Sequence, residues 1–298
     1  PLSRLNYTGL LTIGTGVTID LGTQPGHGDR DGGLRLNGLG RSGTTFTVDG
    51  TDANANNEGR SGNMFTNLNY IDIISIEAIQ EVQTVKDVIA AEYGQALSGN
   101  VNIITKSGTN EYHVSAFENF QSQRLNARNQ FLPNKPPLTF NQFGGSVGGP
   151  IRKNKLFFFG AYEGYRETTS RLLSGNKPTA ELRAQLIRAV PAYKLALDGM
   201  PLPNQPYAPG ANVGFFQTGK SGHSRDNHVV AKGDFQLTDA SRLALTYTHG
   251  RPFRQEPSSD LRNDTIFYGF QERATASFVT GGAAWTSETR FGFNLNDL

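Results

Sequence analysis

Cysteine is absent from the 298-residue sequence, so disulfide bonds and thiolate metal sites are excluded. No run of roughly eighteen apolar residues occurs either, which excludes a transmembrane helix. An excess of one charge is also missing. The formal net charge is +2, with acids and bases interspersed, so no basic stripe marks a nucleic-acid partner.

Glycine and aromatic residues are plentiful: the sequence has 35 Gly, 19 Phe and 10 Tyr, a mixture that suits β-structure with tight turns and aromatic girdles. Up to about Lys106 the expected elements are short and mixed. Runs rich in β-branched residues predict strands at 34–36, 45–48, 79–85 and 101–105, and a short helical or turn-like piece at 87–95. Two polar, glycine-rich stretches, 20–33 and 51–63, are predicted to be exposed loops.

After residue 108 the pattern changes to period two. Val229, Ala231 and Phe235 fall on one face of a run, while His228 and Lys232 fall on the other. The same alternation places Leu243, Leu245 and Tyr247 opposite Arg242, Thr246 and Thr248. Near the end it places Trp285, Phe291, Phe293 and Leu295 opposite Glu288, Arg290 and Asn294. Such runs predict strands with one face on an apolar medium and the other on water.

The predicted connections alternate in length. Residues 150–155 and 237–242 are short turns, whereas 121–138, 166–225 and 250–271 are long and polar. Alternation alone does not distinguish an outer-membrane barrel from a soluble sandwich. Short turns on one side and long loops on the other favour the barrel. In the longest loop, helical spacing predicts a small helix over 179–197, which Pro191 ends or kinks.

No catalytic group or metal site is apparent, and no cofactor is expected. The five His residues are scattered, without ligand spacing. Residues 37–43 (NGLGRSG) lack the GK[ST] of a phosphate loop, so their glycines are interpreted as turn residues. Asp49 and Gly50 are predicted to form a turn in which Asp accepts from backbone N–H groups and Gly supplies a positive φ.

Several segments resemble the TonB-dependent outer-membrane receptors. Residues 76–120 (IEAIQEVQTVKDVIAAEYGQALSGNVNIITKSGTNEYHVSAFENF) resemble their plug-to-barrel junction, and 45–54 (TFTVDGTDAN) resemble the preceding plug strand and turn. Residues 140–167 (FNQFGGSVGGPIRKNKLFFFGAYEGYRE), with 1–17 (PLSRLNYTGLLTIGTGV), resemble the Oar-like branch of these receptors. The match extends over about the first 170 residues.

The resemblance implies an α+β plug domain, 1–106, followed by antiparallel strands of a transmembrane β-barrel, 107–298. The second part would hold about seven of about 22 barrel strands. An open sheet of that size leaves an unpaired edge in lipid, so the sequence is expected to be a fragment. It is expected to lack the TonB-contacting region, the small domain before the plug and most of the barrel. The expected location is the cell outer membrane.

The implied partners are TonB, outer-membrane lipid and an unidentified solute, which could be a siderophore, glycan, cobalamin or peptide. By position, loops 20–33 and 51–63 resemble the family's outward-facing plug loops. Their candidate solute-binding side chains are Gln24, His27, Asp29, Arg30, Asn54, Asn56, Asn57 and Arg60. Alternatively, these residues fill the lumen by hydrogen bonding to its wall.

Three functions are compatible with this reading of the sequence to different degrees. The first is TonB-energised uptake of a large or scarce solute, with the plug gating the lumen. The second is an interaction or secretion role in which large external loops dock a protein or peptide. The third, a β-rich hydrolase, requires paired carboxylates at adjacent strand ends, and no such pair stands out. The sequence therefore favours the receptor and argues against an enzyme.

Overall fold

The structure is a computed structural model. It describes Leu11 and residues 14–19, 34–36, 44–53, 74–86, 99–125, 127, 135, 137–257 and 264–297. In this part of the chain, no helix is long and apolar enough to cross a membrane.

The N-terminal strands form two small sheets. β1 (Val17–Ile19) pairs with β2 (Leu34–Leu36) in one, and four strands in the order β4-β3-β6-β5 form the other, here called the plug sheet. Its strands are β3 (Thr44–Val48), β4 (Thr51–Asp52), β5 (Ile79–Lys86) and β6 (Gly99–Thr105). β3 and β6 run parallel and the other pairs antiparallel. The short 3₁₀ helix η2 (Ile76–Ala78) leads into β5.

A compact apolar core holds the plug sheet together. Phe46, Val48, Val101 and Ile103 come from its two parallel strands and are almost completely buried. Loss of their apolar surface from water is the main favourable contribution to the folding of this small sheet.

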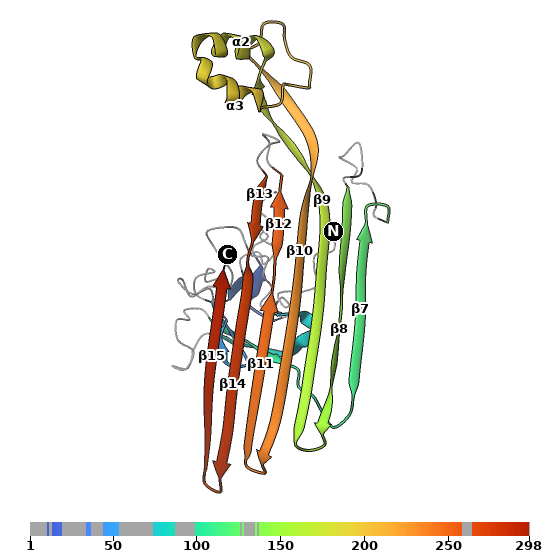
Figure 1. The fold of residues 1–298 in the computed structure, drawn as a ribbon, viewed down its shortest axis with the longest axis vertical. Coiled ribbons are helices and arrows are strands. Elements are labelled where there is room, and N and C mark those ends of the chain that lie inside the picture. Colours follow the sequence, from blue (N-terminus) through green and yellow to red (C-terminus); the bar gives the residue numbers. More distant parts are fainter. Residues whose placement is uncertain are drawn as a thin grey trace.

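The remaining strands build one large antiparallel sheet, here called the wall (Figure 1). Seven of its nine strands follow the order β15-β14-β11-β10-β9-β8-β7, and β12 and β13 extend it beside β10. The bounds are β7 (His113–Ser122), β8 (Leu138–Arg152), β9 (Leu156–Pro178), β10 (Val213–Thr238), β11 (Ser241–Gly250), β12 (Phe253–Glu256), β13 (Thr265–Tyr268), β14 (Phe270–Gly282) and β15 (Trp285–Asp297).

β9 and β10 continue well beyond their neighbours as a two-stranded hairpin, here called the finger (residues 170–222). Its far end carries α2 (Ala180–Ala189), η3 (Pro191–Tyr193) and α3 (Lys194–Asp198), as Figure 1 shows. The helix predicted for 179–197 is confirmed, with the expected break at Pro191. The loop predicted for 166–225 is wrong over much of its length, because 166–178 and 213–225 are strand and only 179–212 connects them.

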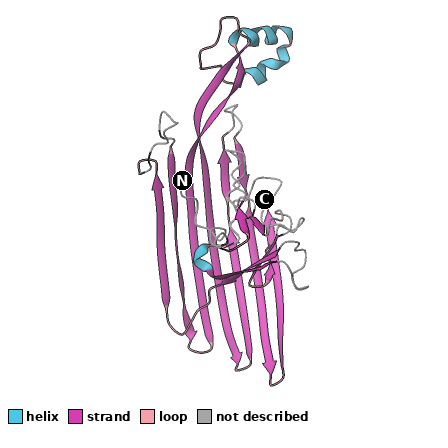
Figure 2. Ribbon diagram, turned by 180° about the vertical axis from the view of Figure 1, so that it is seen from behind, coloured by secondary structure: helices cyan, strands magenta, loops and turns pink. Residues whose placement is uncertain are grey.

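The two faces of the wall differ as the period-two pattern predicts. Residues that point toward the plug sheet are buried, including Val230, Thr246 and Thr248, while Leu245 and Tyr247 on the other face are exposed. Viewed from behind, the plug sheet and η2 lie against the inward face (Figure 2). An α+β plug against antiparallel strands of a transmembrane barrel is therefore the fold of this chain.

Trp285, Phe291 and Phe293 lie on the outward face and are each at least half exposed, as expected for side chains that meet lipid. Glu288 and Arg290 point inward, where they line a cavity beside the plug sheet. This assignment agrees with energetics, because an arginine facing hydrocarbon at the bilayer midplane costs about 2–4 kcal/mol.

Candidate functional site: the contact between plug sheet and wall

The centre of the contact is a tight turn between β3 and β4. Val48 pairs with Thr51, so Asp49 and Gly50 form a two-residue hairpin loop. Both have positive φ, 49° for Asp49 and 74° for Gly50, which is the conformation of a type I′ turn. Asp tolerates this region better than most residues, and Gly adopts it without cost. The predicted turn is confirmed, and its tip points at the wall.

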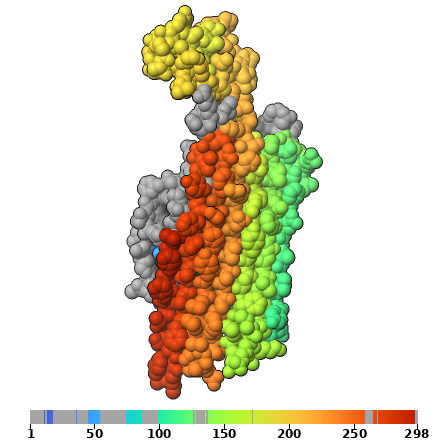
Figure 3. Space-filling view, in the orientation of Figure 1, coloured from blue at the N-terminus to red at the C-terminus, as the bar shows by residue number. Residues whose placement is uncertain are grey.

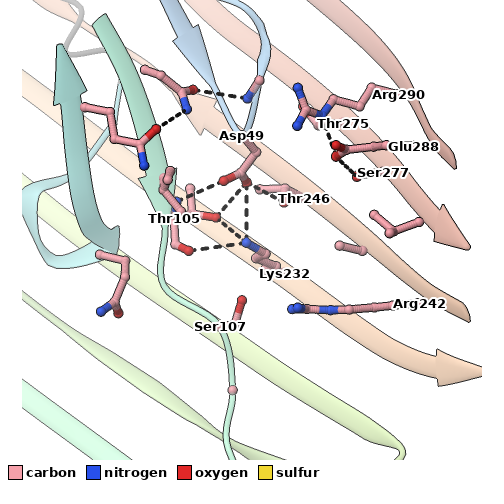
Figure 4. A pocket seen from close by; sticks show the side chains of 18 of the residues that line it. Asp49, Thr105, Ser107, Lys232, Arg242, Thr246, Thr275, Ser277, Glu288 and Arg290 are labelled. Carbon is pink, nitrogen blue, oxygen red and sulfur yellow. Dashed lines mark hydrogen bonds and ion pairs between the residues drawn. The ribbon is translucent and has the colours of Figure 1, made fainter. Parts of the chain in front are cut away.

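The carboxylate of Asp49 joins three strands. Its Oδ1 accepts from the backbone N–H of Thr105 at 2.9 Å, and its Oδ2 accepts from the Thr105 hydroxyl at 2.7 Å. The same Oδ2 accepts from the hydroxyl of Thr246 on β11 at 2.9 Å and lies 3.6 Å from Lys232 Nζ on β10. Figure 4 shows these groups converging on Asp49. One turn residue thus fastens the plug sheet to two wall strands.

Lys232 completes this group. Its ammonium donates to the hydroxyl of Thr105 at 2.8 Å and to the carbonyl of Thr105 at 3.3 Å. The side chains of Lys232 and Asp49 are only 8% and 12% exposed. Removing one partner of such a shielded ion pair is costly, because the remaining charge stays in a poorly solvated environment.

Two further polar contacts support the first. The hydroxyls of Thr51 on β4 and Thr275 on β14 are 2.9 Å apart. At the other end of the plug sheet, Ser75 donates to Glu163 on β9 at 2.8 Å, and Gln142 on β8 donates to the same carboxylate at 3.0 Å. Glu163 is buried, and its carboxylate accepts one hydrogen bond from the plug and one from the wall.

The contact is not wholly polar. Phe159, Ala161 and Val230 of the wall belong to the same buried cluster as the plug-sheet core. Replacing one of these buried apolar side chains by a smaller one removes buried apolar surface from the contact and is therefore destabilising.

Beside the Asp49 turn lies a polar cavity of about 780 Å³ between the plug sheet and the wall (Figure 4). Lys232, Arg242 and Arg290 line it together with Asp49 and Glu288. Arg290 donates to Glu288 at 2.7 Å, and Arg242 donates to Asp234 at 2.5 Å. The wall residues of the cavity lie near the ends of β10, β11, β14 and β15 at which short turns join the strands. In outer-membrane barrels that is the periplasmic side.

The candidate solute-binding residues belong to stretches that the structure leaves undescribed. Gln24, His27, Asp29, Arg30, Asn54, Asn56, Asn57 and Arg60 all lie outside the described residues. The start of the predicted loop 51–63 is corrected, because Thr51 and Asp52 form strand β4. Among the described residues, no group of three or more His, Asp or Glu side chains could hold a metal ion.

The comparisons with known proteins agree with this architecture. A model of the family described as "Outer membrane beta barrel domain" matches residues 104–193. The TonB-dependent transporter Oar of Myxococcus xanthus is 28% identical over 146 residues, which are 46% of this chain and 13% of that protein. The probable TonB-dependent siderophore receptor PirA of Acinetobacter baumannii is 29% identical over 168 residues, 54% of this chain and 21% of that protein. The chain thus spans well under two thirds of either relative.

Two solved structures share the fold. The outer membrane transporter YddB from Escherichia coli superposes with a TM-score of 0.64 at 13% identity, over 97% of this chain and 36% of that one. A mutant of the ferric enterobactin receptor PfeA from Pseudomonas aeruginosa gives a TM-score of 0.57 at 14% identity, over 97% and 38%. Identities this low show the fold alone.

Fold, contact and comparisons define an outer-membrane β-barrel protein whose lumen holds a plug. Within that class, the chain is similar to TonB-dependent outer-membrane receptors, among them the Oar transporter. Its location is the cell outer membrane.

Proposed function

We propose that this chain supplies the plug and the first barrel strands of a receptor that imports a large or scarce solute, energised by TonB, with the plug gating the lumen. The observation that carries the proposal is the contact at Asp49. Side chains hold the plug sheet to the wall there, so the two can separate while every wall strand keeps its backbone ladder. The relatives, which are named as transporters and receptors rather than enzymes, support it.

A pair of engineered cysteines tests the gating step. The hydroxyls of Thr51 and Thr275 touch across the contact, so cysteines at both positions are close enough for a disulfide. We expect the oxidised T51C/T275C receptor to lose uptake, because β4 can no longer leave β14, and we expect reduction to restore it. The solute is first found by a growth screen over ferric siderophores, cobalamin, glycans and peptides.

The matched control joins two wall strands. Ser241 and Thr280 are cross-strand partners with hydroxyls 2.8 Å apart, so S241C/T280C forms a comparable bond within the wall. This control should transport solute in both redox states. Normal uptake by the oxidised plug-to-wall variant, with the disulfide verified, would show that the plug does not part from the wall at this contact.

We also propose that loop 20–33 and the loop that follows β4 bind the solute through Gln24, His27, Asp29, Arg30, Asn54, Asn56, Asn57 and Arg60. The support is their position after strands β1 and β4, whose backbone ladders fix the loop roots. Amides suit hydroxyl-rich or peptide-like solutes, and a guanidinium suits a carboxylate or an anionic chelate.

Replacement of Arg60 by Ala tests this assignment. It should weaken binding of an anionic solute by about 1.5–3 kcal/mol, the usual contribution of a hydrogen bond to a charged group. Affinity is measured on the full-length receptor in detergent, with a triple Asn→Ala variant at 54, 56 and 57 in parallel. Arg188→Ala on α2, with the same loss of charge, serves as the control. Unchanged affinity in both loop variants would mean that these residues only fill the lumen.

The finger favours a second candidate, the docking of a protein or peptide from outside. Its helical end exposes Val190, Tyr193, Leu195 and Leu202, of which Leu195 is 79% exposed. Arg183 holds this end together by donating to the carbonyls of Leu197 and Met200, at 2.9 and 2.7 Å. Desolvation lowers the pKa of the Arg183 guanidinium from its usual value, but arginine remains charged.

Replacing residues 179–212 by a tight turn separates the two candidates. An importer without this docking role keeps its uptake rate, whereas a docking protein loses partner binding while its barrel still assembles. Loss of both uptake and partner binding would indicate that the finger serves solute capture.

A further inference from the structure

Two arginines face each other where the finger leaves the wall. Arg166 on β9 and Arg225 on β10 are direct cross-strand partners in an uninterrupted antiparallel register. Directly opposed residues share one face of a sheet, with Cβ atoms about 4.5–5.5 Å apart. Like charges in that position are destabilising. A nearby anion, either a carboxylate of the chain or a bound ligand, would offset this repulsion.

The chain provides no carboxylate for this pair among the described residues. Glu163, Glu167 and Asp226 lie on the same two strands but alternate onto the inward face, away from it. The neighbours that share the outward face with the pair are uncharged or imidazole side chains: Asn141, Thr168, His223, Asn227 and Phe253.

Arg166 is held in place by the sheet. Its guanidinium donates to the carbonyl of Asp226 at 2.8 Å and to the side-chain oxygen of Asn227 at 2.7 Å, and it lies 5.9 Å from the ring of Phe143. These acceptors are neutral, so they orient the cation without neutralising it.

Arg225 is exposed and less engaged. Its guanidinium lies 4.6 Å above the ring of Phe253 on β12, and the described residues give it no hydrogen bond or ion pair. The aromatic face orients the guanidinium and leaves its N–H groups available. The directly opposed residues thus carry one half-buried guanidinium that the sheet fixes and one exposed guanidinium with free donors.

The position of the pair relative to the lipid identifies the anion. Below Arg166, the outward residues of β9 are Leu156, Phe158, Gly160, Tyr162 and Gly164, all without charge. At ~3.3 Å per residue and a tilt of about 40°, the stretch from Leu156 to Arg166 rises about 25 Å, the height of the apolar band of an outer-membrane barrel. The pair sits at the upper edge of that band, on the side of the long connections, which is the extracellular side.

We propose that Arg166 and Arg225 bind the phosphate of a lipid headgroup in the outer leaflet. Guanidinium groups take phosphate in a bidentate manner, and one phosphate between the two forks removes their mutual repulsion. Acyl chains of the same lipid lie along the apolar band below, over Tyr162 and Val229. The site lies on β9 and β10, the middle strands of the wall, whose outward face is continuous from β7 to β15 (Figure 3). The lipid-binding proposal does not depend on the import proposal.

The test is competition between two lipids on the full-length receptor. The receptor is purified in detergent, supplied with equal amounts of phosphatidylglycerol and phosphatidylcholine, and its lipid adducts are counted by native mass spectrometry. We expect a preference for phosphatidylglycerol that Arg225→Ala reduces by about tenfold, the effect of losing one charged hydrogen bond. Arg225→Lys should lie between the two, because it keeps the charge and loses the fork. Arg188→Ala, at the far end of the finger, should match wild type.

Three outcomes would overturn the proposal. One is an Arg225→Ala receptor that keeps the wild-type preference while its thermal unfolding is unchanged. A second is an Arg188→Ala receptor that loses as much preference as Arg225→Ala, which would mean a general charge effect. The third is complete displacement of phosphatidylglycerol by excess sodium phosphate, which would identify an ion site rather than a lipid site. If Arg225→Ala does not fold, Arg225→Gln replaces it with the same expectation.

Discussion

At the scale of single residues, Asp49 meets two separate requirements. The turn requires a residue that accepts a positive φ, and the contact requires a carboxylate at the tip. Asn satisfies the first demand equally well but brings an amide in place of the charge. Its partners Thr246 and Lys232 both lie on the wall, so the residue that closes the plug hairpin is also the residue that fastens it.

Asp49→Asn should weaken the hold of the wall on the plug sheet by about 1.5–3 kcal/mol, because the charge-assisted hydrogen bonds and the pairing with Lys232 are lost. Hydrogen exchange of the full-length receptor checks this. The backbone N–H of Thr105, which donates to Asp49, should exchange faster in the variant.

The control for this change is Asp198→Asn on α3. Asp198 pairs with Lys194 at the exposed end of the finger, where an ion pair contributes at most about 1 kcal/mol. Exchange of Thr105 should be the same as in wild type. Equal protection of Thr105 in the Asp49 and Asp198 variants would show that Asp49 does not hold the plug.

At the scale of elements, strand patterns reveal the surroundings of a strand more readily than its ends. Period two predicted the faces of β10, β11 and β15, because lipid meets the outward side of each strand and the plug or the aqueous lumen meets the inward side. The strand parts 166–178 and 213–225 were missed because most of the finger lies beyond the apolar band and meets water on both sides, so nothing forces alternation. The role of Asp49 could not be predicted from the sequence either, since Thr246 is 197 residues away.

β15 offers a direct test of the face assignment. Spin labels at 291 and 293 should collide with oxygen, and labels at 288 and 290 with an aqueous quencher, because the strand alternates between lipid and lumen. The chain contains no cysteine, so single introduced cysteines define the labelled sites within it. The reverse pattern would mean a register shifted by one residue, which exchanges the two faces of the strand.

At the scale of the whole molecule, the plug sheet and the wall are stabilised in different ways. The wall is one continuous ladder of antiparallel pairs. If its strands separated in a bilayer, their backbone N–H and C=O groups would find no water for hydrogen bonding. The plug sheet has four short strands, a small core and a contact made of side chains. The two parts are therefore expected to differ in resistance to denaturant, even though they share the apolar cluster around Phe159 and Val230.

Urea should unfold the full-length receptor in two steps, the plug first and the barrel at much higher concentration. Ser75→Ala should move only the first midpoint. Its hydroxyl donates to buried Glu163, and loss of one hydrogen bond to a buried carboxylate costs about 1.5–3 kcal/mol. Thr280→Val should leave the first midpoint in place, because that hydroxyl bonds only within the wall, to Ser241. The two steps are followed with a fluorophore on a cysteine at Gln83 of β5 and by loss of heat-resistant mobility in gels, respectively. A single transition seen by both probes, shifted equally by both variants, would mean that plug and barrel unfold as one unit, and gating by release of the plug alone would then lose its physical basis.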